Sequence, residues 1–230
     1  MKKLLIFLLV DLIIGIALVF FLMRPKTLGI RYTAEDLSSV KAKLNVTTEA
    51  LPTNTPLGQT LLVTGGHPVD ATFTSQELTA LVDNRHNDYA YFPFRNVQIR
   101  IVSDGSVEGS ATVSYQDAVN YLVSLGIAQA DISEGVNKFK IPKTNLPVYL
   151  KVSGSIENNQ SLIKIHGAKI ANISIPQKYI TEYSPALLNL IDDVIADRQP
   201  SVDIYKLGVE NGQVRFQGTA PDKEQAVRGN

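Results

Sequence analysis

Residues 97–113, with the sequence VQIRIVSDGSVEGSATV, decide the fold class of this chain. Val97, Ile99 and Ile101 alternate with polar residues, which predicts a strand with one apolar face. Asp104-Gly105 is a two-residue turn signal typical of a hairpin. The apolar register resumes on the return strand at Val107, Gly109, Ala111 and Val113. The stretch therefore predicts an antiparallel hairpin that is covered on one face only.

Two later stretches repeat this pattern. Residues 148–156 and 162–170 flank a turn at Asn158-Asn159, and residues 202–209 and 214–218 flank a turn at Asn211-Gly212. Asn-Gly and Asn-Asn are suited to turns whose central residues need positive φ. Three hairpins with one apolar face each predict a sheet whose second layer is helical.

Helix starts are marked by side chains that can cap a first turn. Thr33, Thr74 and Ser114 are each followed three residues later by Asp or Glu, the spacing of a capping box. Ser184 followed by Pro185 predicts a fourth start, because proline suits the first helical position. The helix predicted from there to Asp197 carries a broad apolar stripe at Leu187, Leu188, Leu190, Ile191, Val194 and Ile195.

The N-terminal run from Leu4 to Met23 predicts a membrane anchor. Asp11 is its only ionisable residue, and twenty residues at ~1.5 Å each give roughly 30 Å of helix, enough to cross a bilayer. A cleaved signal peptide needs small residues at its end, where this run has Phe20 and Phe21. We expect a single-pass protein of the cell membrane, with a cytoplasmic N-terminus and an extracytoplasmic main domain. Asp11 either pairs within the membrane or is tolerated there.

The expected fold class is α+β, in which an N-terminal transmembrane helix precedes antiparallel β-hairpins that form a curved sheet packed on amphipathic helices. The domain division that follows from composition has five parts. They are an anchor at 1–26, a juxtamembrane helix at 27–45, a Thr/Pro-rich linker at 46–61, an extracytoplasmic α+β domain at 62–220 and a disordered tail at 221–230.

Composition excludes several classes of function. The whole chain has 22 basic residues (Lys and Arg) and 22 acidic residues (Asp and Glu). When Lys2, Lys3 and Asp11 are left out, residues 24–230 contain 20 basic and 21 acidic residues. Such a balance predicts no nucleic-acid partner. The chain has no Cys, which excludes disulfides, thiolate metal sites and Cys nucleophiles.

Catalytic signals are weak. His86 lies among Asp83, Asn84 and Asp88, where a metal could be held, but a solvated helix end explains the same residues. Ser-x-x-Lys occurs twice, at Ser38 and at Ser161, without the companion motifs of acyl enzymes. We therefore expect a protein that is not an enzyme and has no cofactor and no metal site.

Small residues in the apolar strand register bear on binding. Gly109, Ala111, Gly154 and Gly218 stand where Val or Ile would fill space, so they either admit a closely packed helix or leave a trough for an apolar ligand. The residues expected to line such a trough are Val97, Ile99, Ile101, Gly109, Ala111, Leu150, Val152, Gly154, Leu187 and Ile191.

The order of elements carries a family resemblance. An anchor is followed by a capped helix at Phe73–Leu78, by hairpins, by residues 170–176 leading into a long helix, and by a final Asn-Gly hairpin. Over roughly residues 70–220 this order resembles uncharacterised membrane-anchored bacterial envelope proteins related to the tubular lipid-binding (TULIP-like) superfamily. The resemblance implies a curved antiparallel sheet that wraps a helix and binds lipid inside, and it assigns no functional residue.

Two functions follow as hypotheses. In the first, the domain binds an apolar ligand, lipid, next to the bilayer that residues 4–23 span. In the second, it is a structural or interaction module with a fully packed core that presents a surface to an envelope protein partner. An internal cavity favours the first, and an exposed apolar patch over a filled core favours the second.

Overall fold

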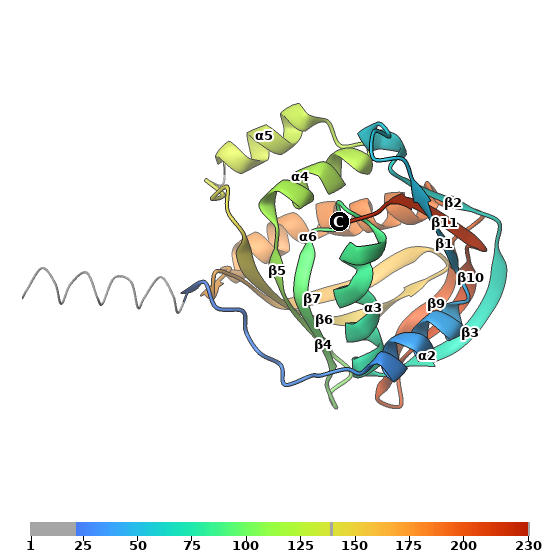
Figure 1. Ribbon diagram of the computed structural model, residues 1–230. Coiled ribbons are helices and arrows are strands. Elements are labelled where there is room, and N and C mark those ends of the chain that lie inside the picture. The colour runs from blue at the N-terminus through green and yellow to red at the C-terminus, as the bar shows by residue number, and fades with distance from the viewer. Residues whose placement is uncertain (1–21, 139, 230) are drawn as a thin grey trace, which may run out of the picture.

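The computed structural model describes residues 22–138 and 140–229, and these residues form an α+β fold (Figure 1). The described part contains five α-helices and two sheets, and the larger sheet is strongly curved. The helices are α2 (Ala34–Leu44), α3 (Ser75–Asp88), α4 (Tyr115–Ser124), α5 (Gln129–Lys138) and α6 (Gln177–Ala196).

The larger sheet is built around β6 (Leu146–Glu157). One edge of β6 pairs with β7 (Gln160–Ile170), and β8 (Ile173–Ser174) follows β7. The other edge pairs first with β5 and then, over the last three residues of β6, with β9. The sheet therefore divides along β6 into two arms. These are β5 (Val107–Val113) with β4 (Phe94–Ile101), and β9 (Asp203–Glu210) with β10 (Gln213–Ala220) and β3 (His67–Phe73).

All three predicted hairpins are confirmed. They are β4–β5, β6–β7 and β9–β10, and each pair is antiparallel. The turn residues adopt the positive φ that the sequence predicts, at Gly105 (80°), Asn158 (50°), Asn159 (66°), Asn211 (51°) and Gly212 (76°). Asn and Gly tolerate this conformation at little steric penalty, which is why the turns form at these positions.

The smaller sheet contradicts two of the predicted domain boundaries. Residues 46–61 were expected to be a linker and 221–230 a disordered tail. Instead β1 (Thr47–Leu51) pairs in parallel with β11 (Lys223–Val227), which also pairs with β2 (Leu61–Thr64). A 3₁₀ turn, η1 (Leu57–Gln59), lies between β1 and β2. Both segments belong to the domain because each satisfies the backbone hydrogen bonds of the other, an interaction that local composition does not reveal.

The helix caps are confirmed at three of the four predicted starts. Thr33 and Thr74 form complete capping boxes, and the Ser114 side chain accepts from the Asp117 amide. The fourth prediction is wrong, because α6 begins after Pro176 and already contains Pro185. The Ser184 hydroxyl donates to the Ile180 carbonyl oxygen within the helix instead of capping it.

Helix α3 protects the free edge of β4. Side chains at Ser75, Thr79 and Asp83 accept hydrogen bonds from the amides of Ile101, Ile99 and Val97, at 3.0, 2.9 and 2.7 Å. Residues four apart on a helix are ~6 Å apart along its axis, and residues two apart on a strand are ~6.6 Å apart along the strand. Side chains on successive turns of α3 can therefore reach every second amide of β4. An edge strand that would otherwise expose its amides is thereby closed by side chains.

Residues 22–31 form a strap across the outer face of the sheet. The Leu28 amide donates to the Gln98 side chain at 2.8 Å, and the Ser110 hydroxyl donates to the Lys26 carbonyl oxygen at 2.5 Å. Beneath the strap, the Tyr149 hydroxyl donates to Glu108 and thereby lowers the pKa of that carboxyl. Burial and the same hydrogen bond raise the pKa of Tyr149 to about 12.

The predicted membrane anchor falls outside the described residues except for Leu22 and Met23. Within the part of the chain that the structure describes, no helix has the length and the apolar composition needed to cross a membrane.

Glu77 joins helix α2 to the rest of the domain. Its buried carboxylate accepts from the Thr74 amide at 2.9 Å and from Ser39 and Lys43 of α2, both at 2.6 Å. Burial opposes ionisation of Glu77, but the hydrogen bonds from Lys43 and Ser39 outweigh it and hold the pKa below its ordinary value of 4.5.

Replacement of Thr79 by Val tests the closure of the β4 edge. The change keeps the shape of the side chain but leaves the Ile99 amide without its acceptor beside the buried Thr79 position, which should destabilise the fold by about 1–3 kcal/mol. Urea unfolding followed by circular dichroism measures this loss. The control is Thr181→Val on an exposed position of α6, which should leave stability unchanged; equal effects would contradict the role of Thr79.

The Glu77 contacts predict a pH dependence. A carboxyl whose folded pKa is depressed stabilises the fold above its ordinary pKa and loses that contribution as pH falls through the folded value. The stability difference between the native chain and Glu77→Gln should therefore be constant above about pH 5 and shrink below pH 4.5. Urea midpoints of both proteins between pH 3 and pH 7 give this difference, and a difference independent of pH would refute the assignment.

Candidate functional site

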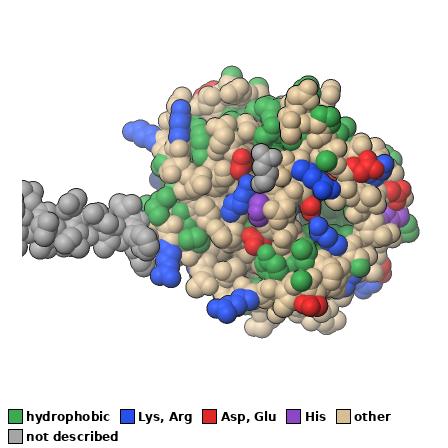
Figure 2. Space-filling model, viewed as in Figure 1, with side chains coloured by type: hydrophobic (Ala, Val, Ile, Leu, Met, Phe, Trp, Pro, Cys, Tyr) green, Lys and Arg blue, Asp and Glu red, His purple; other side chains and the backbone are tan. Residues whose placement is uncertain are grey.

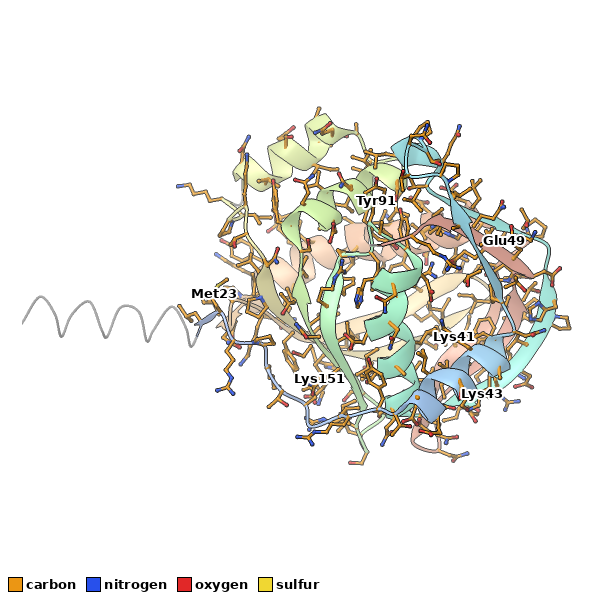
Figure 3. The ribbon with its side chains drawn as sticks, viewed as in Figure 1. Met23, Lys41, Lys43, Glu49, Tyr91 and Lys151 are labelled. Carbon is orange, nitrogen blue, oxygen red and sulfur yellow. The ribbon has the colours of Figure 1, made fainter. Side chains whose placement is uncertain are left out.

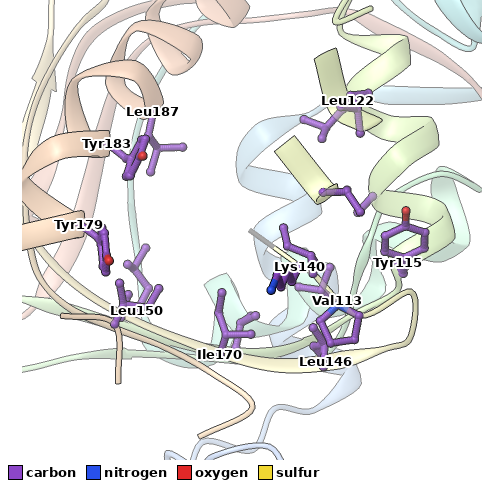
Figure 4. Close-up of a pocket in the computed structure, with 18 of the residues that line it drawn as sticks. Val113, Tyr115, Leu122, Lys140, Leu146, Leu150, Ile170, Tyr179, Tyr183 and Leu187 are labelled. Carbon is purple, nitrogen blue, oxygen red and sulfur yellow. The ribbon is translucent and has the colours of Figure 1, made fainter. Parts of the chain in front are cut away.

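A large cavity separates the first half of α6 from α4 and α5 (Figure 4). Its volume is about 1050 Å³. Strands β6 and β7 form its floor, α6 forms one wall, and α4, α5 and residues 140–144 form the other. In Figure 4, Tyr179, Tyr183 and Leu187 face Leu122 and Tyr115 across the open space.

The lining of this cavity is almost entirely apolar. Of 24 lining residues, 17 are aliphatic or proline and three are tyrosine. The residues that α4 and α5 contribute share one helical face each, at Ala118, Val119 and Leu122 and at Ile132 and Val136. Such a surface excludes most polar ligands because their hydrogen bonds to water would be lost without replacement.

Several large apolar side chains around the cavity are partly exposed. Among the residues that the structure describes, eleven large hydrophobic side chains are exposed, and six of them line this cavity. They are Ile141, Leu150, Ile170, Tyr179, Tyr183 and Leu187, with exposures between 36% and 42%. Close packing is the normal state of a protein interior, so this apolar surface is suited to an apolar occupant.

Helix α6 has a cavity half and a packed half. Tyr179, Tyr183 and Leu187 line the cavity. One and two turns beyond Leu187, Ile191 and Ile195 pack in the hydrophobic core with Ile156 of β6 and Ile204 of β9. The second arm of the sheet contributes Ile204 to the packing of this half, whereas the first half faces the cavity above β6 and β7.

A few polar groups reach the cavity. Lys138, Lys140 and Thr144 belong to the wall that leads from α5 into β6, and no Asp or Glu is among the lining residues. The hydrogen bond to the neighbouring Glu182 carboxylate raises the pKa of the Tyr183 hydroxyl above its ordinary value. The cavity thus combines long apolar walls with two cationic side chains, the arrangement that suits an anionic amphiphile.

The structure brings together only part of the predicted trough. Leu150 and Leu187 line the cavity. Gly109 pairs with Leu150 and Ala111 with Val148, so both lie on the face of the sheet that carries the cavity. Val97 lines a separate recess of about 390 Å³, and Ile191 lies in the packed core. The remaining predicted residues, Ile99, Ile101, Val152 and Gly154, are not among those that line the cavity.

Two of the glycines serve different purposes. A Cβ at Gly109 would have no heavy atom within 4 Å, so the space above this residue is open. A Cβ at Gly154 would lie 2.0 Å from the Leu162 carbonyl oxygen, and its φ is 119°. Gly154 is therefore required by the backbone, next to the register shift between β6 and β7, and does not hollow out a trough.

Helix α5 and residues 140–144 were missed by the sequence analysis. The apolar residues Ile132 and Val136 are spaced i and i+4 and could have marked the face of α5 that lines the cavity. Residues 140–144 carry no such period, and their contribution depends on where the tertiary structure places them.

Polar clusters outside the cavity form no catalytic or metal-binding arrangement among the described residues. Ser153 and His166 share a hydrogen bond of 2.7 Å on the exposed face of the β6–β7 hairpin, and among the described residues no carboxylate pairs with this imidazole. His86 contacts the Asp83 backbone carbonyl oxygen, while the Asp83 carboxylate is used by the Val97 amide and the Tyr32 hydroxyl. No group of three or more His, Asp or Glu able to hold a metal occurs in the part that the structure describes.

Alanine substitutions on α6 test whether the cavity half is unpacked. Ile195→Ala removes a side chain that is 6% exposed in the core and should destabilise the fold by about 2–5 kcal/mol. Leu187→Ala removes a side chain that is 42% exposed and should change stability by at most about 1 kcal/mol. Urea unfolding measures both, and equal losses would show that Leu187 is packed.

The chain was compared with protein-family models, with curated proteins and with solved structures, and none of these comparisons found a match.

Proposed function

We propose that this chain is a single-pass membrane protein of the cell envelope whose extracytoplasmic domain binds the apolar chain of a lipid. Residues 4–23 are the anchor, with the N-terminus in the cytoplasm and the described domain outside it. The observation that carries the lipid assignment is the apolar cavity between β6, β7, α4, α5 and α6.

The dimensions of the cavity support an acyl chain as the occupant. About 1050 Å³ is at the upper end of the ~300–1,000 Å³ typical of small-molecule sites. Each methylene that moves from water into such a site contributes about 0.8 kcal/mol of binding free energy. A long acyl chain therefore gains enough free energy to offset the conformational and translational entropy that it loses on binding. A compact polar metabolite would gain nothing comparable from these walls.

The cationic residues support an anionic head group. Lys138 and Lys140 are the charged residues of the lining. Lys138 is the last residue of α5, and Lys140 follows that helix. A carboxylate or phosphate at this point would be attracted by both, while its chain lay between Leu150, Ile170 and Leu187. The proposed ligand is accordingly a fatty acid or an anionic phospholipid.

The architecture is compatible with the family resemblance. A curved antiparallel sheet, a long helix α6 on its cavity face and an apolar space between them are the coarse features of tubular lipid-binding domains. The alternative, an assembly module with a fully packed core, is less favoured because the cavity leaves much of one half unfilled. Kinship with that superfamily is part of the proposal.

Photo-crosslinking of the full-length chain in its native membrane tests lipid binding. A benzophenone amino acid at Leu187 points into the cavity, whereas the same group at Leu162, which is 59% exposed, lies outside it. After irradiation, mass spectrometry of the peptide containing residue 187 should reveal lipid adducts. The matched peptide containing residue 162 should carry none.

Both positions are exposed leucines, so incidental contact with free lipid would label them equally. Equal labelling, or an unlabelled residue 187 in cells that express the folded protein, would reject the lipid-binding proposal. The mass of the adduct would identify the lipid, and a phospholipid or a fatty acid would each fulfil the expectation.

A further inference from the structure

The end of the domain from which the anchor departs carries an apolar surface surrounded by positive charge. Met23, Ile141, Ile170, Ile173 and Tyr179 form this surface, here called the docking face, and their exposures run from 36% to 61%. In Figure 3, Met23 lies at one end of the molecule and Glu49 near the other. Ile141, Ile170 and Tyr179 also line the cavity, so its wall continues onto this face.

No free linker separates the apolar run 4–23 from the domain. The Asn172 side chain donates to the backbone carbonyl oxygens of Leu22 and Arg24, at 3.3 and 2.7 Å. Asn172 occupies the turn between β7 and β8, directly between Ile170 and Ile173. The chain is therefore bound to the docking face at the residue where its apolar run ends, and the strap continues this attachment along the sheet.

The charge of this end differs from that of the whole chain. Within residues 22–25, 138, 140–144 and 169–183, six Lys and Arg residues stand against one acidic residue, Glu182, a net of +5. The complete chain has a net charge of zero, so the excess is local. The six are Arg24, Lys138, Lys140, Lys143, Lys169 and Lys178. Figure 2 shows Lys and Arg side chains around this end of the molecule.

We infer that the docking face lies on an anionic bilayer and that the cavity opens toward the lipid. The inference rests on the proposed anchor, because residue 23 is where a membrane-spanning run ends and the domain begins. Isoleucine and tyrosine side chains enter the interfacial layer, and each Lys or Arg near an anionic surface strengthens binding about fivefold. Lipid would then reach the cavity from the bilayer without crossing water.

Tryptophan fluorescence of the full-length chain tests this orientation. The chain has no Trp, so Ile173→Trp introduces the only one, at a side chain that is 61% exposed. In vesicles of phosphatidylcholine and phosphatidylglycerol with brominated acyl chains, its emission should shift to the blue and be quenched by bromine. Tyr205→Trp is the control, since Tyr205 is 57% exposed and its strand lies at the opposite end of β6. Ile173 is level with Val148 of β6, and Tyr205 lies just beyond the end of that strand, beside Asn158. About ten residues along β6, or ~33 Å, therefore separate the two probes, so the control should not be quenched.

Replacement of Lys169 and Lys178 by Gln should reduce the ratio of docked to undocked protein about 25-fold. Vesicles of phosphatidylcholine alone, which carry no net negative charge, should also reduce the quenching of the native-charge protein. Ile173→Trp that is quenched no more than Tyr205→Trp would overturn the docking inference. Retention of the chain in carbonate-washed membranes reports the anchor, and lipid adducts at residue 187 report the cavity. Failure of docking is thereby distinguished from failure of the proposed function.

Discussion

Strand β6 is the constraint on which the rest of the fold depends. Its outer edge is fully used by β7, so every other strand of the larger sheet must attach to the remaining edge. Over Leu146–Val152 that edge pairs with β5, and over Ser155–Glu157 it pairs with β9. Because two neighbours share one edge, the sheet divides and its arms diverge. Gly154, with a φ of 119°, lies where the change from one neighbour to the other occurs.

The division of the sheet decides where the domain is filled. Near the end of β6, Ile156 meets Ile204 of the second arm and Ile195 of α6, and these residues form the packed core. Near the start of β6, the helices α4 and α5 stand away from α6, and the space between them is the cavity. One helix therefore provides core residues in its last turns and cavity residues in its first. The packed half supplies the stability that allows the other half to remain open.

Segments on the outside of the domain hold this arrangement in place. The strap holds residues 22–31 against the outer face of β4 and β5, and α3 closes the free edge of β4 with its side chains. Strand β11, near the C-terminal end of the described chain, pairs with β1 and β2 in a small separate sheet. As a result the point where the apolar N-terminal run ends, the turn at Asn172 and the wall of the cavity are fixed relative to one another.

The sequence by itself determined the hairpins, their turns and three helix starts, because strand alternation, Asn-Gly turns and capping boxes are local in the chain. It also marked Leu150 and Leu187 as apolar positions of a strand and a helix, and both line the cavity. Only the tertiary structure decided that Ile191 is packed while Leu187 is not, since one turn of helix separates a filled region from an open one. Likewise it alone brought β1 to β11 and residues 140–144 to α6, because contacts between distant segments depend on how the sheet divides and leave no periodic signal in the residues themselves.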